Sequence, residues 1–294
     1  MNQRSKIRQC ALHYIYAKTQ GGQTVFAEDL FWDIALEKER EHYHRSFAKM
    51  LAHTARNSQD SFRLLEERLN ALIDATAEDM TTSSLRDELS RFLTQSSKLE
   101  ASIIALGHAL VDKRREDCEP LVALSSELIA TADVLKHLGP DLSFMLADYP
   151  TYARYAEGVK AIIKRRLVIG ERIVAMRDVD LLPADGEYKA LIKASKDLAS
   201  IRPAAEELAQ NVLSQQERWE EIIEPLLKNY SMQRLDLLDK CILFLMLYEL
   251  KMLELPLPVV VSEANALANA YSGSKSATFI HGVLAAAHKT EPTS

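Results

Sequence analysis

Three cations open the chain: Arg4, Lys6 and Arg8 lie within five positions, and no acidic residue occurs before position 28. Cations gathered at the start of a helix gain affinity for phosphate groups by releasing counterions. They also oppose the helix dipole, which disfavours a purely stabilising role at that place. We therefore regard these three side chains as candidates for binding a nucleic acid. The alternative is a merely solvated N-terminus.

Three more residues extend this candidate RNA surface. Tyr16 has a ring that can stack on an unpaired base, although a tyrosine at helical spacing more often packs in a core. Lys275 and Phe279 come at the start of the last expected helix, where a lysine next to helix N–H groups is suited to phosphate. For Phe279, packing in the core is the alternative.

A second group of cations lies in the middle of the chain. Charge runs on amphipathic helices are usually solvated faces, but this one could also form a second nucleic-acid surface. Its members are Lys160, Lys164, Arg165, Arg166, Arg172 and Arg177.

Other kinds of chemistry find little support. Cys10, Cys118 and Cys241 lie too far apart for a disulfide framework or a CxxC site, and free thiols suit the reducing cytoplasm. The chain has no P-loop, nucleophile elbow or GxGxxG fingerprint. We therefore expect no catalytic residue, no metal and no cofactor, and hence no enzyme. The net charge of −6 argues against a chain that coats nucleic acid without specificity.

The composition predicts an all-α protein. Nine glycines and nine prolines are few for 294 residues, and Leu, Ala, Glu and Lys are helix formers. Apolar spacing and breakers predict a first helix at 3–19 that ends at Gly21-Gly22, and then helices over 27–58, 61–74, 85–110, from Pro120 to Gly139, from Pro150 to before Pro183, and over 203–228, 232–254, 258–271 and 275–288. A break with an N-cap is expected at 81–84.

Two of these helices have distinctive apolar patterns. Residues 241–247 are apolar nearly all round, which predicts a buried central helix. That run is far shorter than the ~20 residues that span a bilayer, and the N-terminus lacks the apolar stretch of a signal peptide, so we expect no membrane partner. A coiled-coil-like seam, interrupted only by Ser96, is formed by Leu85, Leu89, Phe92, Leu99, Ile103, Leu106 and Leu110.

Four segments carry a resemblance to a known family. The first is the basic start, Arg4 to Tyr16. The second is Arg234-Leu235 with Asp239 and the run Leu247-Tyr248-Glu249-Leu250. The third is Pro258 followed by Glu263-Ala264, and the fourth runs from Thr278 to Ala285. In this order and at these distances they resemble the NusB transcription antitermination factors, over about residues 3–19 and 202–288.

The resemblance implies an all-α, NusB-like helical bundle core with an inserted helical hairpin or bundle. Residues 1–24 supply its first helix, 25–200 form the insertion, part of which could belong to the core, and 201–294 supply the rest. It also implies a cytoplasmic RNA-binding factor that holds boxA-like ribosomal RNA leader together with the ribosomal protein NusE and acts on RNA polymerase. Arg234 and Asp239 match the region where NusE docks, and Asp239 would pair with its basic surface. The alternative for Asp239 is to complement the helix dipole.

Two other functions stay open. The chain is also similar to the NusB-like RNA-binding module of ribosomal RNA methyltransferases, although it has no glycine-rich cofactor loop and ends soon after the core. It could also be a helical scaffold that has lost RNA binding. In its favour, Thr278, His281 and Ala285 replace the family's Lys, Asn and Asp.

Overall fold

The computed structural model describes residues 2–20, 26–56, 59–111, 118–184, 186–227 and 231–289. Over these residues the chain forms twelve α-helices and short 3-10 turns, with no strand, so the all-α prediction is confirmed. The expected helix end at Gly21-Gly22 lies outside the described residues. The α-helices are α1 Gln3–Gln20, α2 Glu28–Ala35, α3 Glu37–Arg56, α4 Gln59–Ala75, α5 Ser83–Val111, α6 Glu119–Met145, α7 Ala153–Ala175, α8 Lys189–Leu213, α9 Gln216–Ile223, α10 Leu237–Lys251, α11 Leu257–Tyr271 and α12 Ser274–Lys289.

The chain divides into two compact units, each with a hydrophobic core of its own. Unit 1 comprises residues 1–37 and 197–294, and unit 2 comprises residues 38–196. The helix α2 belongs to unit 1 because Trp32 is 2% exposed and stacks on Tyr14 of α1, with 5.6 Å between the ring centroids. The sequence had placed these residues in the expected insertion 25–200, with the proviso that part of it could belong to the core.

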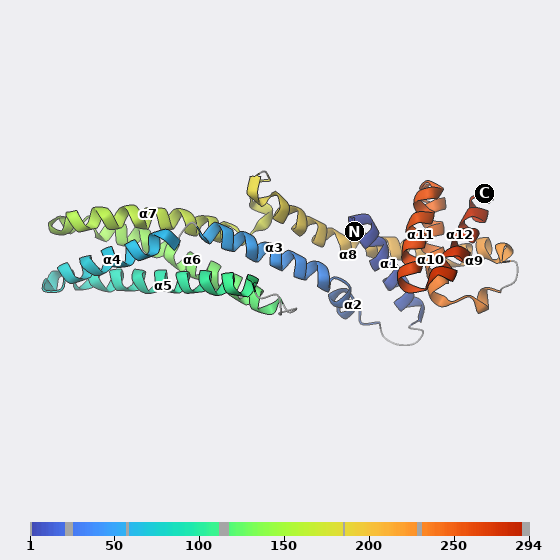
Figure 1. Ribbon diagram of the computed structural model, residues 1–294, viewed down its shortest axis with the longest axis horizontal. Helices are drawn as coiled ribbons and strands as arrows, with labels where there is room; N and C mark the ends of the chain where they lie inside the picture. The colour runs from blue at the N-terminus through green and yellow to red at the C-terminus, as the bar shows by residue number, and fades with distance from the viewer. Residues whose placement is uncertain are drawn as a thin grey trace. The chain divides into compact units, whose positions relative to one another are not determined.

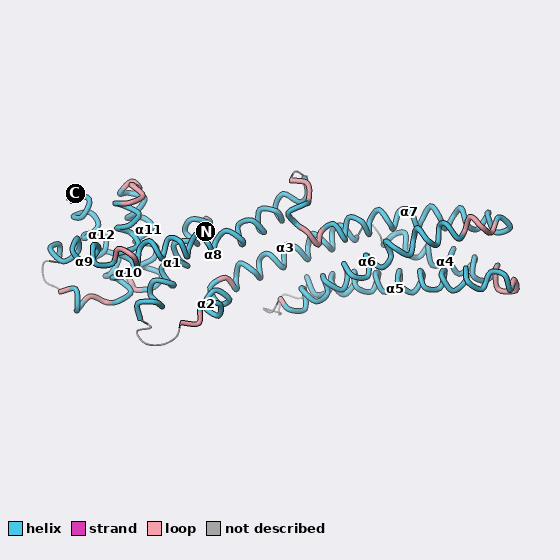
Figure 2. The backbone as a smooth tube through the Cα atoms, turned by 180° about the vertical axis from the view of Figure 1, so that it is seen from behind, coloured by secondary structure: helices cyan, strands magenta, loops and turns pink. Residues whose placement is uncertain are grey.

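Unit 2 contains a four-helix bundle. Contacts join α4 to α5, α5 to α6, α6 to α7 and α7 back to α4, and Figure 1 shows these helices running alongside one another. In Figure 2 the turns after α4 and after α6 lie at the same end of the bundle. They are tied there by two hydrogen bonds, from Tyr149 Oη to the Thr81 carbonyl and from Tyr152 Oη to Asp79 Oδ2, both 3.2 Å.

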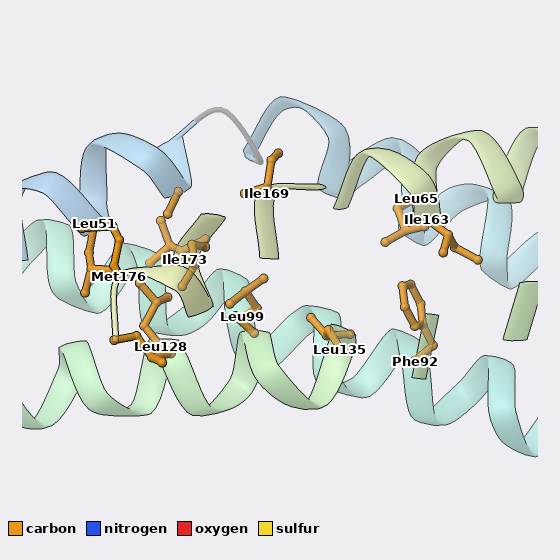
Figure 3. Packing of buried hydrophobic residues seen from close by; sticks show 14 of the residues in the cluster. Leu51, Leu65, Phe92, Leu99, Leu128, Leu135, Ile163, Ile169, Ile173 and Met176 are labelled. Atoms are coloured by element: carbon orange, nitrogen blue, oxygen red, sulfur yellow. The ribbon is translucent and has the colours of Figure 1, made fainter. Parts of the chain in front are cut away.

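The seam predicted on α5 forms the inner face of this bundle. Its residues from Leu85 to Leu106 are buried, and Ser96 is buried with them. Figure 3 shows Phe92 of α5 facing Leu65 of α4 and Ile163 of α7. Side chains from all four helices therefore meet in one apolar interior, as a seam at coiled-coil spacing requires.

Unit 1 is built around α10. This helix packs against α1, α9, α11 and α12, and every residue from Cys241 to Leu250 is buried. The predicted central helix is therefore confirmed. Within the described residues, no helix combines the length and the apolar character that crossing a membrane requires.

Several predicted helix boundaries were wrong. The expected helix 27–58 is interrupted at Leu36, which ends α2. Pro140 and Pro203 lie inside α6 and α8 and neither end nor begin them. A proline inside a helix removes one hydrogen bond and crowds the carbonyl four residues earlier, and the buried residues on both sides of each proline offset this cost. The helix expected from 232 begins at Leu237, where Asp236 caps it by accepting from the Leu238 N–H at 2.9 Å.

The break expected at 81–84 coincides with a short 3-10 turn, Met80–Thr82, that leads into α5. Asp79 caps this turn, and its Oδ1 accepts from the Thr81 N–H at 2.9 Å.

Candidate nucleic-acid and partner interface

The start of α1 presents cations in the first turns of a capped helix. Asn2 caps the helix by accepting from the Ser5 N–H at 2.8 Å. Arg4 is exposed and Lys6 is partly exposed, so both cations lie at the surface. Such an end offers unpaired N–H groups and basic side chains together, which is the chemistry that binds phosphate.

Arg8 was predicted to bind RNA together with Arg4 and Lys6, but it does not lie at this surface. It is 6% exposed, and its Nε donates to both carboxylate oxygens of Glu249, at 2.7 and 2.9 Å. Its Nη1 lies 3.4 Å from Glu263, which also accepts from the Ser5 hydroxyl at 3.1 Å. The guanidinium is therefore already held by α10 and α11 and joins them to α1.

The carboxylate of Glu249 is buried together with its partner. Burial raises the pKa of Glu249, and the neighbouring Arg8 opposes that rise. The two groups also contribute to the floor of a hollow of about 260 Å³, whose other lining residues are Arg4, Ile7, Leu208, Leu253 and Leu255. Arg4 thus lies one turn above a buried ion pair.

Tyr16 is partly buried and packs against the core of unit 1. This contact favours the structural role weighed for it, and it leaves part of the residue accessible.

A second hollow brings together four of the predicted site residues. It measures about 350 Å³ and lies where the start of α10 meets the start of α12. Arg234 and Asp239 were predicted for a protein partner, and Lys275 and Phe279 were predicted for RNA, yet all four line this hollow. Its remaining lining residues are Leu235, Asp236 and Ser276.

Asp239 lies in this hollow as a structural group. It is 7% exposed, and its Oδ1 accepts a hydrogen bond of 2.6 Å from the Ser272 hydroxyl, in the turn that follows α11. Its position in the first turn of α10 also complements the helix dipole. Its burial and this hydrogen bond favour the structural alternative that was weighed for Asp239 over direct pairing with a basic partner. Among the residues that line the hollow, Arg234, Asp236 and Lys275 are the exposed charged ones.

The predicted turn between α11 and α12 positions the other wall. Gly273 has φ +120, a backbone conformation that side chains disfavour, and it directs the chain from α11 into α12. Lys275 is exposed in the first turn of α12, and Phe279 one turn later is partly buried against the core. An aromatic ring and a cation therefore share one helix start.

The sequence prediction missed two functional positions that hold this interface together, Glu249 and Glu263. The position of Glu249 was informative: it is a carboxylate inside the apolar run that ends α10, and a buried carboxylate requires a paired cation. Among the described residues, no group of three or more His, Cys, Asp or Glu side chains is placed to hold a metal ion.

Comparisons with known proteins agree on one family. The NusB family model matches residues 173–289. The "Transcription antitermination protein NusB" of Clostridium botulinum is 36% identical over 115 residues, which are 39% of this chain and 78% of that protein. The proteins of the same name from Listeria monocytogenes and Macrococcus caseolyticus are 32% and 40% identical, over 94% and 62% of their lengths and 42% and 27% of this chain. No solved structure was found to match.

Proposed function

The chain belongs to the NusB family, and on that premise we propose that it is an RNA-binding transcription antitermination factor. It holds a boxA-like segment of ribosomal RNA leader together with the ribosomal protein NusE, and the assembly acts on RNA polymerase in the cytoplasm. The observation that carries this proposal is the match to antitermination proteins over most of their length. The function is binding, without catalysis.

The RNA surface comprises the starts of α1 and α12. Arg4 and Lys6 in the first turns of α1 and Lys275 in the first turn of α12 provide cations next to helix N–H groups, and both features favour phosphate. Phe279 and Tyr16 provide aromatic rings with part of each residue accessible, which suits stacking on unpaired bases. Arg8 supports this surface from beneath.

The partner surface is the charged rim of the hollow at the start of α10. Arg234 and Asp236 are exposed there, while the buried Asp239 fixes the turn that holds α12 in place. Charges at the rim of an interface act mainly on association rate and specificity. We assign the docking of NusE to this side of unit 1.

Unit 2 is an insertion in the family core. The first helices of unit 1 precede it in the chain and the remaining helices follow it. In this proposal unit 1 carries the family function, and unit 2 adds a bundle with a core of its own.

The test measures the affinity of the full chain for a boxA-containing RNA at two salt concentrations, with and without NusE. We expect NusE to raise the affinity. Neutralising one phosphate-binding cation, by Arg4→Gln or Lys275→Gln, should lower the slope of log K against log salt by about 0.7. The matched control is Lys289→Gln, an exposed lysine in the last turn of the same helix as Lys275.

The proposal fails if NusE leaves the RNA affinity unchanged and the Arg4 and Lys275 variants behave as Lys289→Gln does. A separate titration with S-adenosylmethionine addresses the methyltransferase alternative. We expect no binding, and saturable binding would favour that alternative.

A further inference from the structure

The helix α7 of unit 2 is strongly basic in an acidic chain. It carries six basic and two acidic residues, whereas the net charge of the whole chain is −6. Its buried face contributes Val159, Ile163 and Ile173 to the bundle core. Apart from the buried Arg166, the charged residues of the helix therefore lie away from this face.

The contacts divide the predicted basic cluster into engaged and available members. Arg166 is 4% exposed inside the bundle and lies 3.7 Å from Glu100. Arg172 pairs with Glu187, and Arg177 lies 3.3 Å from Asp133. Those three side chains are accounted for within unit 2.

The remaining three point outward. Lys164 and Arg165 are exposed and Lys160 is partly exposed. Across the part of the chain that the structure describes, no ion pair joins any of the three to a carboxylate. Their positive charge is therefore directed to whatever approaches this side of α7.

The neighbouring helix α4 adds a cation to the same side. The helices α4 and α7 lie side by side in the bundle (Figures 1 and 2). The guanidinium of Arg68 lies against α7 at Gly158, so close that a Cβ at that position would collide with its Nη1. Arg154, one turn before Gly158, is exposed. The absence of a side chain at Gly158 thus lets a cation from α4 lie on α7.

These cations form a linear array. At 1.5 Å per residue, Arg154 and Arg165 are about 16 Å apart along α7, with Arg68 between them. Lys160 and Lys164 lie on the other flank of the outward face, because at about 100° per residue they are offset from Arg154 and Arg165 by about a quarter to a third of a turn. Glu157 lies within the array, three residues after Arg154 and three before Lys160, and Glu171 lies beyond its far end. Five cations against these two carboxylates leave the face with a net positive charge.

We propose that the α7 basic face, formed by Arg68, Arg154, Lys160, Lys164 and Arg165, binds the phosphate backbone of single-stranded RNA. A linear polyanion matches cations spread along one helix. The alternative partner is a protein with an acidic surface. Such a partner would be expected to need a central apolar or aromatic cluster on this face, because a few such residues dominate the binding energy of protein interfaces. This inference rests on the proposed function, since it extends the RNA contact from unit 1 to unit 2.

The test compares RNA lengths on the full chain. A boxA-containing RNA of about 10 nucleotides probes the sites of unit 1, and the same RNA extended with unstructured sequence to about 40 nucleotides can also reach α7. The variant is Lys160→Gln, Lys164→Gln and Arg165→Gln combined. The matched control neutralises three exposed lysines elsewhere in unit 2, at Lys49, Lys98 and Lys193.

We expect the triple variant to bind the long RNA roughly 30- to 100-fold more weakly near 0.1 M salt and to lower the salt slope by about 2, from about 0.7 per lost contact. Binding of the short RNA should not change, and the control triple should keep wild-type affinity for both. Wild-type affinity of the triple variant for the long RNA, or an equal loss in the control, overturns the inference. If the wild-type chain binds neither RNA, the proposed function itself has failed.

Discussion

The guanidinium of Arg8 lies between two carboxylates, Glu249 and Glu263, and is almost completely buried. The two charges of a buried ion pair compensate each other. Removing one of them leaves the other uncompensated in a medium of low dielectric. Arg4, one helical turn earlier, is exposed. Two arginines four residues apart are therefore expected to have different functions.

Replacing these two arginines should separate stability from binding. Arg8→Ala should lower the free energy of unfolding by about 3–5 kcal/mol, because it leaves Glu249 buried and unpaired. Arg4→Ala should change it by less than about 0.5 kcal/mol and should weaken RNA binding instead. Urea denaturation followed by circular dichroism measures the first effect. An Arg8→Ala protein as stable as the wild type would contradict the structural role given to this pair.

The same residues show how far the sequence could define the site. The cations at positions 4 and 6 were singled out from their spacing together with the family resemblance, and Glu249 inside an apolar run already required a buried cation. That Arg234 and Lys275 line one hollow was not predictable, because it depends on how α12, which follows the turn at Gly273 after α11, packs against α10. Spacing along a chain describes one helix and does not describe the angle between two.

At the scale of the helices, α7 combines a buried charge with an exposed array. Its Arg166 lies over the Phe62 ring at 5.0 Å and 3.7 Å from Glu100, and none of its guanidinium nitrogens has a hydrogen-bond partner among the described residues. Burial lowers the pKa of Arg166 and raises that of Glu100. The interior of the bundle therefore contains an ion pair whose desolvation is poorly offset.

For this ion pair we expect a single substitution to destabilise the protein more than a double substitution. Glu100→Ala alone should lower the free energy of unfolding by roughly 3–5 kcal/mol, since Arg166 then has no counter-charge. The double variant Glu100→Leu with Arg166→Met should be at least as stable as the wild type, because apolar side chains of similar volume avoid the desolvation cost. Denaturation midpoints of the two variants decide the matter, and a double variant less stable than the single one would refute it.

Most of the helices could be predicted from the sequence, and their ends could not. The apolar spacing of α5 and α10 predicted their burial. The seam on α5 leaves one face of that helix to water, and the apolar run of α10 leaves none. The prolines misled: Pro140 and Pro203 have the local preference of a helix boundary, yet packing on both sides keeps α6 and α8 continuous. Tertiary contacts outweigh a single missing hydrogen bond.

At the scale of the molecule, the chain has two separate cores. Phe92 in the core of unit 2 and Phe244 in the core of unit 1 are each 1% exposed. Each unit buries an apolar interior of its own, which is the condition for independent unfolding.

Core truncations should therefore shift different transitions in calorimetry. Phe92→Ala should lower the melting temperature of one transition by roughly 10 °C, and Phe244→Ala should lower that of the other by a similar amount. Each variant is the control for the other. A single transition that both variants shift equally would show that the two units unfold as one.

The rates at which the three buried thiols are alkylated can report how often each core opens. Cys10 and Cys241 lie in the core of unit 1, Cys118 lies in that of unit 2, and burial raises the pKa of Cys241 to about 11. Thiolates are the reactive form, so alkylation of the native protein at pH 8 should await opening of each core. Peptide mass spectrometry would then time the opening of both units in one sample, and a short RNA bound to unit 1 should slow the labelling of Cys10 and Cys241 while Cys118 keeps its own rate.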